Sequence, residues 1–316
     1  MREELFIEVN SNIWRELESQ YNKINKKDIK SFSSLEVKQF LHNFRLCSHH
    51  LAYARTHYPK SKVVAYLNSL VGKCHSHVYA VKKISPEYLL HYIAYGFPRL
   101  LKEYRWYILS SFGFFAIGAL LSLLLVLIDP NNAGIFLPQD MIKGIKSGNL
   151  GGGQWNYPLM SSEIMTNNIT VCLKAFALGI TLGIGTIYVL YSNGAMLGSL
   201  TALVYFYGNP TKFWSLILPH GLIELSAIFI AGAAGLIIAK YILLPGEYTR
   251  KSSLIAGSKK AVSLIIGVAF MLIIAGIIEG FFTPLNIYSS TKLIFAAISG
   301  VILIIYFSIP YILKRP

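Results

Sequence analysis

The amino-acid sequence contains little charge for its length. Of its 316 residues, only 14% are Asp, Glu, Lys or Arg, against about 25% in soluble domains, and 54% are hydrophobic. Such a chain cannot cover a water-exposed surface with charged side chains, so its apolar faces need lipid. The formal net charge of +14 indicates either nucleic acid or an anionic membrane surface as a partner. Hydrophobic runs of spanning length favour the lipid bilayer, and we expect no nucleic-acid partner.

Cysteine and catalytic motifs are also scarce. The three cysteines, Cys47, Cys74 and Cys172, are too few for a disulfide framework. The N-terminal residues MREELFIEVN contain no apolar core typical of a secretory signal, so we expect no cleaved leader. No Gly-rich phosphate loop, serine-elbow motif or nucleotide fingerprint is present. The sequence therefore predicts no enzyme, no catalytic residue and no cofactor.

A zinc site formed by two Cys/His groups is an alternative to the prediction of no cofactor. They are Cys47-Ser48-His49-His50 and Cys74-His75-Ser76-His77, and together they could bind zinc. Their spacing matches no standard zinc finger. Cys74 falls on an apolar helical stripe, so we favour small core residues over metal ligands.

Residues 1–105 carry 17 Lys or Arg and 9 Asp or Glu, with helical periodicity throughout. Ser33 and Glu36 predict a capping box that opens a helix ended by Pro59, and Ser85-Pro86-Glu87 predicts another helix start. We expect Phe97-Pro98 to break that helix before an interfacial basic segment. Residues 1–105 are thus predicted to form an N-terminal helical cytosolic bundle.

Residues 106–316 are predicted to form the transmembrane domain of an all-α, polytopic membrane bundle. Turn residues at Asn193-Gly194 and at Gly208-Asn209-Pro210 divide the apolar runs. An ordered external loop is expected at 129–168. Because the third run is short, a re-entrant segment is the alternative to a full span there. The six predicted segments are 106–128, 170–191, 194–207, 213–239, 261–282 and 293–313.

The distribution of basic residues predicts the orientation. With both termini inside, the short segments place seven Lys or Arg on the inner face and five on the outer face. Dense Lys and Arg before the first span agree with this arrangement. We expect a bacterial cytoplasmic membrane location, with the N-terminus and the C-terminus both cytoplasmic.

Three ionisable residues lie inside the apolar runs: His220, Glu224 and Glu279. A charge at this depth is costly, so such groups normally face the protein interior and find partners. His220 and Glu224 are four residues apart and share one helix face. The functional interpretation is an ion, proton, metal or polar-substrate site. The structural interpretation, to which we give equal weight, is a hydrogen-bond network that fixes helix packing.

Glycines recur at four-residue spacing, as in Gly179 with Gly183, Gly194 with Gly198 and Gly276 with Gly280. Such spacing lets helix backbones approach closely. It predicts either a homodimer interface or tight packing within one bundle. We favour packing within the bundle, because six segments already supply neighbours.

Several motifs taken together resemble the stage II sporulation protein M family. One is Asn167-Asn168-Ile169 followed by FALGITLGIGT and then Asn193-Gly194; others are Pro219-His220-Gly221 leading into Glu224, and Ile278-Glu279-Gly280-Phe281. LAYAR at 51–55 and YLNSLV at 66–71 resemble a longer branch with an N-terminal domain. The resemblance implies a membrane protein without catalytic activity that works with peptidoglycan-cleaving partners during engulfment.

Three functions compete on these grounds. The first is a non-catalytic scaffold or assembly factor in cell-envelope remodelling, sporulation-related by the resemblance, with cell-wall hydrolases and a homodimer as expected partners. The second is a transporter or channel that uses His220, Glu224 and Glu279. The third is an intramembrane metal-dependent hydrolase. We favour the scaffold.

Overall fold

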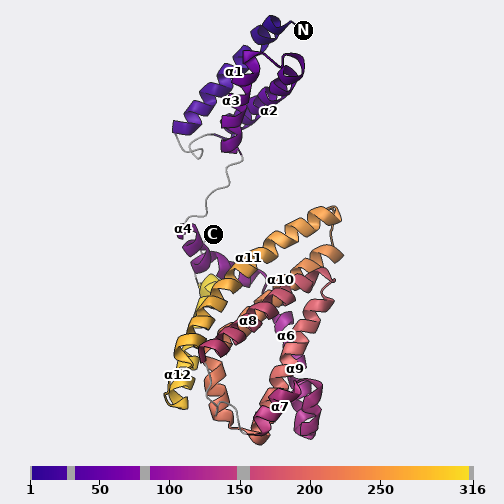
Figure 1. The fold of residues 1–316 in the computed structure, drawn as a ribbon, viewed down its shortest axis with the longest axis vertical. Coiled ribbons are helices and arrows are strands. Elements are labelled where there is room, and N and C mark those ends of the chain that lie inside the picture. The colour runs from indigo at the N-terminus through magenta and orange to yellow at the C-terminus, as the bar shows by residue number, and fades with distance from the viewer. Residues whose placement is uncertain (1, 27–32, 79–85, 148–156, 313–316) are drawn as a thin grey trace. The chain divides into compact units, whose positions relative to one another are not determined.

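The computed structural model describes residues 2–26, 33–78, 86–147 and 157–312. All regular structure in those ranges is helical, which confirms the all-α prediction. The chain divides into two compact units, Met1–Ile84 and Ser85–Pro316 (Figure 1). Each unit has its own hydrophobic core.

The N-terminal unit is a bundle of three helices, α1 (Glu3–Lys26), α2 (Ser34–His57) and α3 (Lys62–Val78), which contact one another pairwise. The predicted capping box is present: Ser33 and Glu36 close the start of α2 with reciprocal hydrogen bonds. The helix ends just before Pro59, as expected.

Cys47 and Cys74 lie fully buried in the core of this unit as free thiols. Burial raises the pKa of the Cys47 thiol to about 12 and that of Cys74 to about 11. The two cysteines are therefore small core residues, as the sequence favoured.

The second unit begins with α4 (Pro86–His91), a π-helical turn η2 (Tyr92–Gly96) and α5 (Phe97–Glu103). The expected break at Phe97-Pro98 does not occur, because the wider π turn before Pro98 accommodates the missing amide. The chain instead bends at Tyr104 (φ −101°, ψ 19°). Phe97 is buried in the core of the second unit, so the boundary predicted at residue 105 lies too late in the chain.

Six long helices form the body of the second unit. Five of them are long and apolar enough to cross a membrane, among the residues that the structure describes. The chain is therefore a multi-pass membrane protein. The long helices are α6 (Arg105–Ile128), α8 (Tyr157–Ala177), α9 (Ile184–Tyr207), α10 (Pro210–Leu243), α11 (Arg250–Ile277, continued by the π turn η5, Ile278–Phe282) and α12 (Ser289–Ile312); of these, α8 alone is not among the five spans.

The predicted segments 170–191 and 194–207 are wrong in their boundaries. The turn lies at residues 178–183, where Leu182 and Gly183 adopt positive φ angles of 58° and 87°. The helix α9 then runs unbroken through Asn193 and Gly194. Asn193 does not make a turn because its side-chain amide donates to the Val189 carbonyl one helical turn back, at 2.7 Å.

The predicted external loop at 129–168 is partly helical. A 3₁₀ turn, η3 (Pro130–Ile135), and α7 (Gln139–Lys146) follow α6. The helix α8 already begins at Tyr157, inside the predicted loop. Residues 148–156, with the three-glycine run, lie outside the described residues.

The helix α10 lies at the centre of the second unit and contacts α6, α8, α9, α11 and α12 (Figure 1). It runs in the same direction as α8: Asn168 contacts Glu224, and Gly179 contacts Gly235 eleven residues further along both segments. The Lys102 ammonium donates to the Pro310 carbonyl at 3.0 Å. The start of α6 and the end of α12 therefore lie at the same end of the bundle.

Candidate functional site

The centre of α10 carries two polar side chains into the bundle. His220 and Glu224 stand one helical turn apart, directly after Pro219, and are only 5% and 6% exposed. Each contacts a different neighbouring segment. Asn168 of α8 donates its side-chain amide to Glu224 Oε2 at 2.6 Å. His220 Nδ1 lies 3.2 Å from Thr283 Oγ1, just after the π turn η5.

Glu279 joins this group from α11. It is 1% exposed and sits within the π turn η5. Its carboxyl group is close enough to Glu224 for the two to interact electrostatically, and Glu224 interacts likewise with the Cys172 thiol of α8. Single π turns inside helices occur often at functional sites because they redirect side chains. The structure thus brings the three residues singled out in the sequence into one interior region.

Lys292 is a member that the sequence analysis missed. It was counted with the outer charges, yet it is only 6% exposed. Its ammonium donates to the Thr283 carbonyl at 2.6 Å. Lys292 therefore ties α12 to the residue that His220 also contacts. We define the polar cluster as Asn168, His220, Glu224, Glu279, Thr283 and Lys292.

The metal site at His220, Glu224 and Glu279 stays a prediction from the sequence. Within the described residues, no three His, Cys, Asp or Glu side chains are arranged to hold an ion. Two of the three side chains contact amide or hydroxyl groups of other segments. Stable metal sites in proteins need several ligands at once, usually four for zinc.

Gly179 and Gly194 are packing residues within the unit, whereas a Cβ atom on Gly280 would meet nothing within 4 Å. A Cβ atom on Gly194 would lie 2.0 Å from the Phe115 carbonyl oxygen of α6, and one on Gly179 would lie 2.3 Å from the Gly235 carbonyl oxygen of α10. Gly183 has φ +87° at the start of α9. The contacts of Gly179 and Gly194 are internal to the unit, as the packing interpretation predicted for them.

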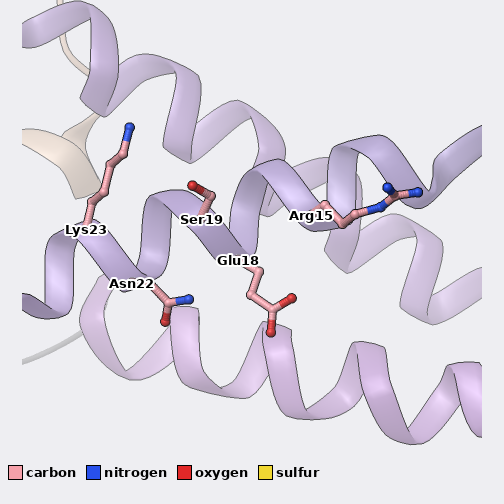
Figure 2. Close-up of a pocket in the computed structure, with 5 residues that line it drawn as sticks. All are labelled: Arg15, Glu18, Ser19, Asn22 and Lys23. Atoms are coloured by element: carbon pink, nitrogen blue, oxygen red, sulfur yellow. The ribbon is translucent and has the colours of Figure 1, made fainter.

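The N-terminal unit has an open surface hollow of about 410 Å³. Its five lining residues, Arg15, Glu18, Ser19, Asn22 and Lys23, all belong to α1, and Figure 2 shows their side chains spread along that helix. Glu18 accepts a hydrogen bond from the Tyr66 hydroxyl at 3.1 Å. The lining residues carry both signs of charge.

Comparison with family models decides the relationship. A model described as "Stage II sporulation protein M" matches residues 111–284, more than half of the chain. The chain belongs to the stage II sporulation protein M family. Most of the polar cluster lies inside the matched region, whereas Lys292 lies beyond it. The family is sporulation-related, and the region of this chain that matches it is the membrane region that contains most of the polar cluster.

The N-terminal unit has a separate match. A model described as "Domain of unknown function (DUF8413)" covers residues 4–80, nearly the whole of that unit. A longer branch of the family, with an additional N-terminal domain, was expected from the sequence and is confirmed by the two matches.

Two curated relatives come from Methanocaldococcus jannaschii. "Uncharacterized protein MJ0793" is 33% identical over 133 residues, which are 42% of this chain and 72% of the relative. "Uncharacterized protein MJ0706" is 29% identical over 123 residues, 38% of this chain and 54% of the relative. No solved structure matches the chain.

Proposed function

We propose that this stage II sporulation protein M family member is a non-catalytic membrane assembly factor for cell-envelope remodelling. Its membrane unit would act as a fixed platform, and its N-terminal unit would bind partner proteins. The expected partners are envelope proteins such as cell-wall hydrolases. A sporulation-specific role is proposed from the family alone.

One observation supports the proposal: three contacts within the polar cluster each join two helical segments. Glu224 joins α10 to α8, His220 joins α10 to the end of α11, and Lys292 joins that same point to α12. Buried polar contacts between spans hold helices in one arrangement. A transport site would instead need polar groups that exchange between partners and substrate.

The proposed orientation places the N-terminal unit in the cytoplasm. Lys102, Lys240 and Lys260 gather where α6 begins: Lys240 lies 5.8 Å from the Tyr107 ring centroid, and Lys260 lies 3.9 Å from a Glu103 oxygen. Clustered cations at one end of a bundle are typical of the cytoplasmic side. Lys251→Cys should react with a membrane-impermeant thiol reagent only in inverted vesicles, and Ser147→Cys only in intact cells. The native cysteines are buried and supply the low background.

Site-specific photo-crosslinking in living cells tests the assembly role. We expect probes at Arg15 and Lys23 on α1 to capture a discrete envelope protein, identified by mass spectrometry, with a cell-wall hydrolase or a protein bound to one among the products. A probe at Ile298, on the exposed apolar face of α12, is the matched control and should capture none. Absence of defined products from α1 would overturn the docking role.

Flux through proteoliposomes tests the transporter alternative directly. Under our proposal, liposomes with the protein conduct ions no faster than empty liposomes. A selective flux that Glu224→Gln or His220→Ala abolishes would overturn the static interpretation of the polar cluster.

A further inference from the structure

A second feature of the membrane unit lies away from the polar cluster. A groove of about 450 Å³ runs between α6 and α12, with α10 as its floor. Its walls are mainly apolar and are built by Ile108 and Phe112 of α6, Phe229 of α10, and Ile304 and Phe307 of α12. We call it the α6–α12 groove. Its size is within the usual range for ligand sites, about 300–1,000 Å³.

The groove has a cationic end. Lys102 and Arg105, from α5 and the start of α6, line it there together with Tyr311 of α12. The Lys102 ammonium lies 4.4 Å from the Tyr311 ring centroid while it donates to the Pro310 carbonyl. Arg105 is exposed and donates to the Lys102 carbonyl at 3.4 Å.

Among the described residues, no carboxylate neutralises either cation, Lys102 or Arg105. The adjacent carboxylate, Glu103, instead lies 3.9 Å from Lys260. Two positive charges thus lie at the end of a groove whose other lining residues are mainly apolar.

The length of the groove suits part of a lipid molecule. Arg105 and Phe112 are seven residues apart on α6, which corresponds to about 10 Å along the helix axis. One leaflet of the hydrocarbon core is about 15 Å thick. With Arg105 at headgroup level, the apolar walls lie beside the part of an acyl chain that is nearest the headgroup.

We propose that the α6–α12 groove is a binding site for an anionic phospholipid. The phosphate lies against Lys102 and Arg105, and one acyl chain lies along Ile108, Phe112 and Phe307. Basic pockets between spanning helices bind acidic headgroups in this way. A free phosphate or a soluble glycerol phosphate lacks the chain that the apolar walls require, so the ligand is the intact lipid.

Native mass spectrometry of the full-length protein tests the proposal. The protein is released from nanodiscs of equal parts phosphatidylglycerol and phosphatidylcholine with identical acyl chains. We expect one retained phosphatidylglycerol per chain. Removal of each cation should weaken retention about fivefold, so Arg105→Gln should lower it about fivefold and the Lys102→Gln/Arg105→Gln double variant about twenty-five-fold. Glycerol phosphate should not compete.

A matched control separates a specific site from general charge. The Arg250→Gln/Lys251→Gln variant removes two exposed cations from the start of α11 and should retain phosphatidylglycerol like the native protein. Ser226→Leu fills the groove floor and should reduce retention of phosphatidylglycerol. Equal retention of the two lipids by the native protein, or equal losses in the two double variants, would overturn the proposal. Melting temperatures close to the native value identify variants that still fold.

Discussion

The amide of Asn168 is the hydrogen-bond donor that the structure assigns to the buried Glu224 carboxyl group. Asn168→Ala removes that donor and leaves the carboxyl group inside the bundle. We expect a loss of about 1–3 kcal/mol in the free energy of unfolding. Thermal unfolding in detergent, followed by tryptophan fluorescence, measures it as a lower melting temperature.

Two further variants make this prediction specific. Glu224→Gln keeps an oxygen that can accept from Asn168, so its melting temperature should fall less than that of Asn168→Ala. Asn132→Ala removes a bond from the Asn132 amide to the Leu125 carbonyl at the exposed end of α6, and its effect should be small. If all three variants unfold at the same temperature, the bond between Asn168 and Glu224 contributes nothing.

The pH response of the N-terminal unit depends on His50. Its Nδ1 accepts a hydrogen bond from Trp14 Nε1 at 3.1 Å, which requires an unprotonated nitrogen. Burial, together with the charge of His49, holds the pKa of His50 below its usual 6.5. The unfolded chain therefore binds the proton more readily, and stability present above pH 6.5 is lost as the pH falls toward the folded-state pKa.

Urea unfolding of a fragment of residues 1–84 measures this effect, because Trp14 is the only tryptophan in that stretch. The unfolding midpoint should drop between pH 7 and pH 5. His50→Asn does not titrate in this range, so its midpoint should change less. An unchanged midpoint in the native fragment would show that His50 has no part in the stability.

At the scale of helices, the sequence predicted which helices exist better than it predicted where each one begins and ends. Ser33 with Glu36 identified the start of α2 because capping is a local interaction. The predicted start at Pro86 agrees with α4, whereas Ser85 lies outside the described residues. The Asn193-Gly194 pair did not mark a turn, because Gly194 is needed for the contact with α6. At the actual turn, the Thr181 side-chain oxygen accepts a hydrogen bond from the Gly185 amide at 2.9 Å. The sequence analysis missed this signal because Thr181 and Gly183 lie within an apolar run.

The crossing of α6 and α9 depends on direct backbone contact. A Cβ atom on Gly118 would lie 2.2 Å from the Tyr191 carbonyl oxygen, whereas one on Gly113 of the same helix would meet nothing within 4 Å. Gly118→Ala should therefore force the helices apart and cost about 1–3 kcal/mol or more. Gly113→Ala should be neutral or stabilising by up to about 1 kcal/mol, because alanine favours the helix.

The matched pair shares one helix and one chemical change, so helix propensity cancels in the comparison. Melting temperatures in the same detergent are the measurement. If Gly113→Ala lowers the melting temperature as much as Gly118→Ala does, the helix crossing tolerates a methyl group. Close packing would then not explain the glycine spacing. Monodispersity by size exclusion reports whether either variant also changes the association state.

At the scale of the whole molecule, composition and run length predicted the all-α membrane fold, because burial in lipid imposes few alternatives. The polar cluster was predicted only in part. His220, Glu224 and Glu279 stand out as ionisable groups within apolar runs. Asn168 and Lys292 lie near the ends of their runs, and only the three-dimensional contacts to Glu224 and Thr283 reveal their positions.

The division into two units predicts that residues 1–84 fold without the membrane unit. The three helices bury Trp14, Leu17, Phe44, Cys47 and Leu67 in a core of their own, and the membrane unit has a separate core. We expect the isolated fragment to be a water-soluble, helical monomer with a cooperative urea transition. Circular dichroism and the Trp14 emission spectrum measure this unfolding transition.

As a control, Leu67→Ala, which truncates a fully buried side chain, should lower the free energy of unfolding by about 2–5 kcal/mol. A fragment that is unfolded, or whose unfolding Leu67→Ala leaves unchanged, would mean that this core needs the rest of the chain, and the N-terminal unit could then not act as an independent docking module.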